Sequence, residues 1–229
     1  MRQFLLLLIS IIEGACLIGV ELTGSKKIAV FFGSSLIVWT SVFVITLLGL
    51  MVGYRLGGNL SLKKDLDKIL FKVLFGTLLY YTITLLLTNA ILSNFVHFSL
   101  IVGSVLSCLI LLFPMFLLFG LVSPILIKLL SKDESEIGKN TGFIYTISTL
   151  GGVCLSLISG LYLIPDFGLK ITSFIISGLI AVIVLASFYN LKMKNFVKFS
   201  AKLPQRVVFV VGVYTIGNIL FDQLYAPVT

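Results

Sequence analysis

Charged residues, histidine and tryptophan are scarce in this sequence of 229 residues. Charged residues make up 11% of it, with one histidine and one tryptophan, whereas about a quarter of a typical soluble domain is charged. The hydrophobic share is 59% and the mean hydropathy is +1.17. This composition excludes an ordinary soluble domain. It also excludes a nucleic-acid-binding surface, because no basic face is interleaved with aromatic residues.

Residues with the usual spacing of catalytic or metal sites are missing as well. Cys16, Cys108 and Cys154 lie in separate apolar windows without a CxxC pair, so we expect them to be packing residues. His97 has no neighbouring nucleophile and orienting carboxylate in the sequence. The acidic residues of SKDESEIGKN are interpreted as a solvated loop. We therefore predict no catalytic residue, no metal and no cofactor.

Long apolar windows alternate with short basic loops, which is typical of a multi-pass membrane protein. A helix that spans the hydrocarbon needs about 20 residues. We predict an all-α bundle of about seven transmembrane helices, forming a single domain over residues 1–229. The expected helices are 4–22, 28–54, 69–92, 98–122, 141–164, 171–188 and 207–224. The last window is short, and the number falls to six if it lies in the membrane interface.

The basic residues predict the orientation of the bundle. All but three of the 17 Lys and Arg residues fall on one side of the membrane if the N-terminus is inside. The three exceptions are Lys26, Lys27 and Lys170. Positively charged loops favour the cytoplasmic side, so we expect a cytoplasmic N-terminus in a bacterial or archaeal inner membrane, with inner loops near anionic headgroups.

Small residues recur at helical spacing in two windows, and two prolines interrupt another. Small side chains let helix backbones approach closely in lipid, so we expect these stripes to pack against neighbouring helices. Pro114 predicts a kink in the window 98–122, and Pro124 predicts a kink or an end just beyond it. The expected packing residues are Gly49, Gly53 and Gly57 in one window and Ser148, Gly152, Ser156 and Gly160 in another.

Parts of the sequence resemble membrane-bound spermidine synthase-like proteins, which are fusions of a major-facilitator-like membrane part with an aminopropyltransferase domain. The resemblance rests on GACLIGVELTGSKKIAVFFGSSLIVWTSVFVITLLGLMVGYRLGG, FPMFLLFGLVSPILIKLL and GKNTGFIYTISTLGGVCLSLISGLYLIPDFGLK. The matching positions include Glu21, Gly24, Lys26, Trp39, Pro124, Gly142, Gly151, Pro165 and Gly168.

The resemblance implies the membrane part of this family and not its reaction. The family's α/β domain usually follows the helices and holds decarboxylated S-adenosylmethionine in a glycine-rich loop. Here the sequence ends at Thr229, and neither Gly57-Gly58 nor Gly151-Gly152 follows a strand, as such a loop requires. We therefore expect a membrane module without the catalytic domain. It would work with a separate cytosolic aminopropyltransferase or another partner in polyamine-related metabolism, docked on residues 190–206.

A small carrier of cationic, polyamine-like solutes is the alternative function, because acidic residues lie in the apolar windows. Glu13 and Glu21 are eight residues apart, so they differ by about 80° around a helix and about 12 Å along it, and both can face one side. Asp166 lies in the outer PDFG turn.

Several roles are open for these acids. Glu21 can pair with Lys26 or Lys27, bind a cationic substrate or carry protons, and Glu13 and Asp166 are further candidates for a substrate or proton site. An intramembrane enzyme is a third class, but no set of residues supports it. The substrate and the oligomeric state, including a homo-oligomer, stay open.

Overall fold

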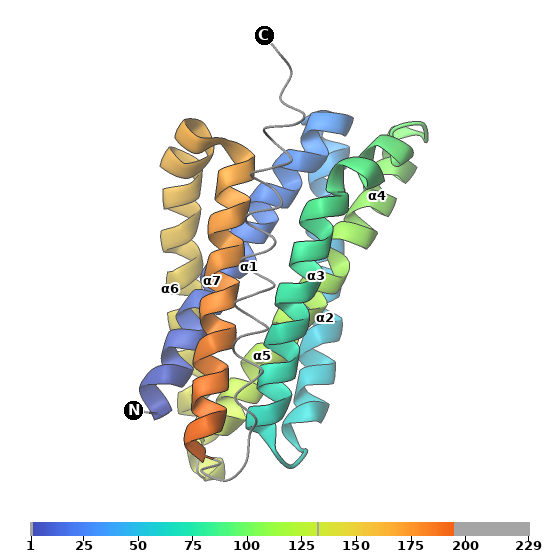
Figure 1. Ribbon diagram of the computed structural model, residues 1–229. Helices are drawn as coiled ribbons and strands as arrows, with labels where there is room; N and C mark the ends of the chain where they lie inside the picture. The colour runs from blue at the N-terminus through green and yellow to red at the C-terminus, as the bar shows by residue number, and fades with distance from the viewer. Residues whose placement is uncertain (1, 132, 195–229) are drawn as a thin grey trace. The chain divides into compact units, whose positions relative to one another are not determined.

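The computed structural model describes residues 2–131 and 133–194, and this part of the chain is helical without a strand. Short turns connect most of the helices, and a 3₁₀ turn, Glu134–Glu136, and a π-helical turn, Ser159–Leu163, flank α6. The helices are α1 (Arg2–Phe32), α2 (Leu36–Ser61), α3 (Leu66–Phe95), α4 (Leu100–Leu111), α5 (Phe113–Leu130), α6 (Ile137–Ile158) and α7 (Ile164–Lys194) (Figure 1).

Successive helices run in opposite directions, and α4 and α5 together form one path across the bundle (Figure 1). Five helical stretches are long and apolar enough to cross a membrane, and the last of them, residues 134–191, contains both α6 and α7. The predicted all-α, multi-pass architecture is therefore confirmed for the described residues. The window expected at 207–224 lies outside them.

The first helix is longer than predicted. We expected a loop between residues 22 and 28, but α1 continues through them to Phe32. The polar residues in this stretch do not break the helix because their hydroxyls bond to its own backbone: Thr23 donates to the Gly19 carbonyl at 2.8 Å and Ser25 to the Leu22 carbonyl at 3.0 Å. The turn comes at Gly33, whose φ of 79° favours glycine, and Ser35 then caps α2.

The chain reverses between α6 and α7 at the predicted PDFG turn. The π-helical turn ends just before Pro165, which has no N–H to continue a helical ladder. Gly168 then adopts φ 77° and ψ 169°, a conformation that is open to glycine and strained for other residues. The helix that follows packs back along the bundle (Figure 1).

The window 98–122 is divided into α4 and α5 at Leu112, two residues before Pro114. Proline cannot donate to the carbonyl four residues earlier, which here belongs to Ile110. The Tyr80 hydroxyl from α3 donates a hydrogen bond to this carbonyl. A side chain from a neighbouring helix thus replaces the bond that Pro114 removes, as membrane helices require. Pro124 does not end the helix, because α5 continues to Leu130.

We predict that Tyr80→Phe lowers the stability by about 1 kcal/mol, because the Ile110 carbonyl loses its donor. In a Pro114→Ala background residue 114 regains an N–H, so the same change should cost much less. Thermal unfolding in detergent, followed by circular dichroism, measures the stability of the parent, the two single variants and the double variant. An equal cost of Tyr80→Phe in both backgrounds would contradict the coupling between Tyr80 and Pro114.

Candidate functional site

The two intramembrane acids of α1 bond to different helices. Glu13 is 1% exposed, and the Ser148 hydroxyl of α6 donates to its Oε2 at 3.2 Å. Glu21 is half-buried and accepts a hydrogen bond from the Thr46 hydroxyl of α2 at 3.2 Å. The structure therefore does not join the two carboxyl groups into one site, although both lie on the same helix.

Glu13 lies in a seam where α1 and α6 are in backbone contact. A Cβ atom on Gly151 would lie 1.9 Å from the Ile11 carbonyl oxygen, and one on Gly14 would lie 2.0 Å from the Ser148 carbonyl oxygen. Ser10 adds a hydrogen bond to the Ile144 carbonyl at 3.3 Å. This close approach, which only glycine permits, is what brings the Ser148 hydroxyl to the Glu13 carboxyl.

The glycine stripe of α2 lies against α5. A Cβ atom on Gly53 would lie 2.4 Å from the Leu117 carbonyl oxygen, and Gly120 faces Gly53 from α5. Gly49 and Gly57 meet α5 one turn to either side, where added Cβ atoms would lie 2.8 Å and 2.9 Å from its atoms. All three glycines thus face the same neighbouring helix.

The stripe in and beyond α6 divides into two parts. Ser148 and Gly152 face α1. Further along, Ser156 bonds to the Val153 carbonyl of its own helix, and no described atom lies within 4 Å of a Cβ placed on Gly160. Gly14 and Gly151, which make the closest contacts of the seam, were not predicted as packing residues, because neither belongs to the stripe of small residues that the spacing indicates.

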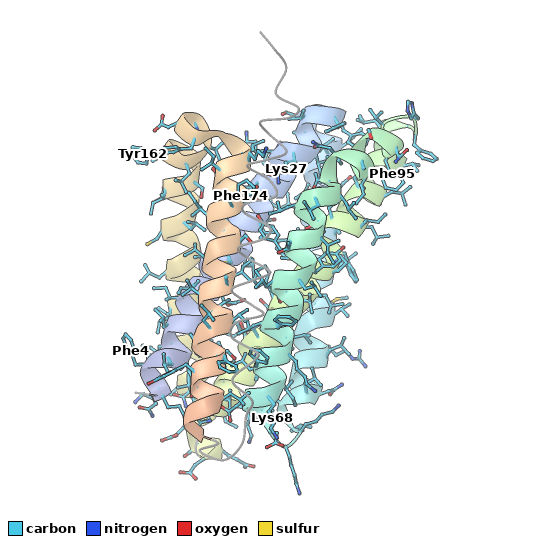
Figure 2. The ribbon with its side chains drawn as sticks, viewed as in Figure 1. Phe4, Lys27, Lys68, Phe95, Tyr162 and Phe174 are labelled. Atoms are coloured by element: carbon cyan, nitrogen blue, oxygen red, sulfur yellow. The ribbon has the colours of Figure 1, made fainter. Side chains whose placement is uncertain are left out.

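Lys26 and Lys27, the expected partners of Glu21, form no ion pair with it among the described residues. Lys26 is exposed, whereas Lys27 is half-buried and lines a cavity of about 30 Å³ between α1 and α3, together with Tyr81 and Thr84. Figure 2 shows Lys27 near the end of α1 that is remote from the N-terminus. Within the described ranges the ion pairs are Arg2–Asp67 and Lys68–Asp65, and neither involves Glu21.

Asp166 is exposed in the short helical stretch before Gly168. No hydrogen bond or ion pair connects it with Glu13 or Glu21 in the part of the chain that the structure describes. The candidate acids thus lie at three separate places: Glu13 in a buried seam, Glu21 half-buried against α2 and Asp166 in an exposed turn.

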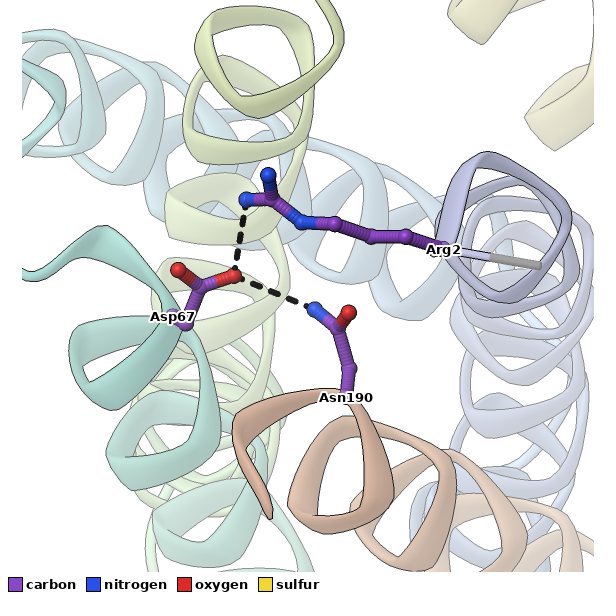
Figure 3. Close-up of polar contacts among 3 residues, drawn as sticks. All are labelled: Arg2, Asp67 and Asn190. Atoms are coloured by element: carbon purple, nitrogen blue, oxygen red, sulfur yellow. Dashed lines mark hydrogen bonds and ion pairs between the residues drawn. The ribbon is translucent and has the colours of Figure 1, made fainter. Parts of the chain in front are cut away.

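A polar cluster that was not predicted from the sequence connects α1, α3 and α7 around the buried Asp67 and Asn190 (Figure 3). Asp67 in the first turn of α3 is 3% exposed, and its Oδ1 accepts hydrogen bonds from Arg2 and Asn190, both at 3.1 Å. Asn190 is 1% exposed. The sequence signals no such pairing, because Asp67 follows a basic loop and its partners are 65 and 123 positions away.

Comparisons with protein-family models, with curated proteins and with solved structures give no match. The resemblance to the spermidine synthase-like family therefore stays a prediction. The long apolar helices support a coarser statement, that the chain is a multi-pass membrane protein in contact with a lipid bilayer.

Asp67→Asn should lower the stability by about 1–2 kcal/mol, because Arg2 loses the charge of its buried partner. The matched control is Asp65→Asn, two residues earlier, which removes an exposed pair with Lys68 and should cost under about 0.5 kcal/mol. Asparagine also tolerates the left-handed backbone of residue 65. Thermal unfolding in detergent compares the two variants, and equal losses would contradict a structural role for the cluster.

Gly151→Ala should separate α1 from α6 and cost about 2 kcal/mol or more, since the added methyl group meets the Ile11 backbone. Gly160→Ala adds the same group where no described atom lies within 4 Å, so its effect should stay within about 0.5–1 kcal/mol. The same unfolding assay tests the pair. A Gly151→Ala protein as stable as the parent would show that the seam is looser than described.

Proposed function

We propose that this chain is a membrane module that holds a cytosolic partner protein at its basic end. The start of α1, the α2–α3 and α5–α6 connections and the end of α7 lie at one end of the bundle (Figure 1). Most of the described Lys and Arg residues lie in these segments or within two helical turns of them, and positive charge favours the cytoplasmic side. This concentration of charge at one end is the observation that carries the proposal.

The cluster of Arg2, Asp67 and Asn190 supports a docking role for this end. It fixes the ends of α1, α3 and α7 relative to one another through hydrogen bonds to the buried Asp67 carboxylate. Next to it the α2–α3 connection presents the exposed Lys63 and Lys64. A fixed platform with exposed ammonium groups suits an acidic surface on a partner, since complementary charge speeds and orients association.

The partner that we propose is an aminopropyltransferase-type enzyme in polyamine-related metabolism. This identity rests on the sequence resemblance, which covers Glu21, Lys26 and the glycines of α6. In the fusions that the chain resembles, the enzyme domain is covalently attached to the helices. Here a separate enzyme would gain the same membrane location by binding to the basic end.

Transport of cationic solutes is the second candidate, and Glu21 is the observation that favours it. Its half-buried carboxyl group accepts a hydrogen bond from Thr46 at 3.2 Å, and a carboxylate can accept several more, so it has acceptor positions for an ammonium group. Against this candidate, Glu13, Glu21 and Asp166 line neither of two cavities in the described part of the chain, of about 30 and 770 Å³. The module is therefore the better supported proposal.

We expect aminopropyltransferase activity to co-purify with the tagged chain from its own membranes in mild detergent. The eluate is assayed for aminopropyl transfer to putrescine. Lys63→Glu combined with Lys64→Glu should reduce the recovered activity at least about fivefold, because reversed charges repel an acidic partner. Lys26→Glu, at the opposite end, is the matched control and should leave the recovery unchanged.

Putrescine uptake into proteoliposomes separates the two candidates. An eluate without transferase activity contradicts the module. If the purified chain also moves putrescine, and Glu21→Gln abolishes that flux, the carrier is the correct function.

A further inference from the structure

A cavity of about 770 Å³ opens at the basic end, between the first turns of α1, the end of α5 and the start of α6. Its volume lies within the usual range of small-molecule sites. The cavity is lined by Gln3, Leu7, Leu130, Ser135, Glu136, Gly138, Lys139, Asn140, Gly142, Phe143 and Thr146.

The cavity exists because α1 and α6 diverge below the seam. At Gly151 the two backbones are in contact, whereas no described atom lies within 4 Å of a Cβ placed on Gly138 or Gly142. The two glycines are one turn apart and both line the cavity. They leave the backbone of α6 bare, with space for a ligand beside it.

At the start of α6, acidic residues come first in the chain and a basic residue follows them. Asp133, Glu134 and Glu136 are exposed at the water-facing 3₁₀ turn that precedes the helix. Lys139 follows, about 4–5 Å further along the chain axis toward the apolar part of α6. Gly142 and Phe143 follow Lys139 in the cavity wall, and Phe143 is 50% exposed. Leu7 of α1 lines the same cavity.

This order matches a zwitterionic phospholipid that stands in the adjacent leaflet. From water to hydrocarbon such a lipid presents an ammonium group, a phosphate group and the acyl chains. We propose that the cavity binds a phosphatidylethanolamine-type lipid, with its ammonium group at the acidic turn, its phosphate group at Lys139 and an acyl chain along Leu7 and Phe143. The proposal does not depend on the proposed partner enzyme.

The surroundings favour a lipid over a water-soluble ligand. The cavity lies at the end of helices that are long enough to span a bilayer, and its wall combines charged, amide and apolar side chains. Phe4, at the start of α1, is 68% exposed beside this end of the bundle (Figure 2). A wholly apolar ring exposed at this level contacts lipid more favourably than water.

The charges also select the headgroup. The Glu136 carboxylate in the cavity wall, with Asp133 and Glu134 exposed just before it in the chain, disfavours a lipid whose headgroup carries only negative charge, such as phosphatidylglycerol. A primary ammonium group donates three hydrogen bonds to carboxylates, whereas the quaternary ammonium group of phosphatidylcholine donates none. We therefore expect phosphatidylethanolamine to bind most tightly and phosphatidylglycerol most weakly.

Native mass spectrometry of the full chain in detergent tests the proposal. The delipidated protein is titrated separately with phosphatidylethanolamine, phosphatidylcholine and phosphatidylglycerol of the same acyl composition. We expect about tenfold tighter binding of phosphatidylethanolamine than of phosphatidylglycerol, as one charge-assisted hydrogen bond can supply. Equal binding of the three lipids, or a preference for phosphatidylglycerol, would overturn the proposal.

Two variants locate the bound lipid. Gly142→Leu fills the cavity with a side chain that meets no described atom near its Cβ, and Lys139→Glu reverses the charge that faces the phosphate group. Each should weaken phosphatidylethanolamine binding about tenfold. Gly160→Leu, an equally open position outside the cavity, is the matched control and should bind as the parent does. Thermal unfolding confirms that each variant is folded, and unchanged binding by a folded Gly142→Leu protein would refute the site.

Discussion

A polar group inside the hydrocarbon must find its hydrogen-bond partner within the protein, because lipid chains offer none. This constraint applies to the Ile110 carbonyl, the Glu13 carboxyl and the Thr23 hydroxyl. Each finds its partner inside the protein: Tyr80 for the carbonyl, Ser148 for the carboxyl and the helix's own backbone for the hydroxyl. Two of these partners come from another helix, so satisfying the polar groups also decides which helices are neighbours. The need to satisfy polar groups inside the membrane thus favours helices and also helps to decide how they pack.

Helix α1 is joined to three other helices by close backbone contacts or polar bonds. It contacts α6 through bare backbone at Gly14, bonds to α2 through Glu21 and bonds to α3 through Arg2. Because lipid provides no hydrophobic drive between helices, such close contacts and polar bonds supply the specificity that a water-excluded core supplies in soluble proteins. A glycine on α1 or α6 is therefore as important to the fold as a large core residue is elsewhere.

The sequence was sufficient for the helical class, for most of the spans and for the sharp turn at Gly168, because these depend on local hydropathy and on backbone conformation. It was insufficient where hydroxyls changed the outcome. The stretch around Thr23 resembles a loop by its polarity, yet side-chain bonds to the backbone keep it helical.

The candidate site was harder to predict than the fold. The spacing of Glu13 and Glu21 allowed a shared face, but the two side chains bond to different helices. No local sequence pattern predicts the Arg2–Asp67–Asn190 cluster, because only the packing of three helices brings its residues together. Spacing along one helix describes that helix alone, and the choice of neighbour is a property of the whole bundle.

The same cluster imposes an order on biosynthesis. Arg2 is made before Asp67, and Asp67 before Asn190, so the helices that carry them enter the membrane one after another. Until α7 arrives, the Asp67 carboxylate lacks the amide that shares its Oδ1 with Arg2. The Arg2–Asp67 pair can join the ends of α1 and α3 first, and the insertion of α7 then completes the cluster by adding the Asn190 amide.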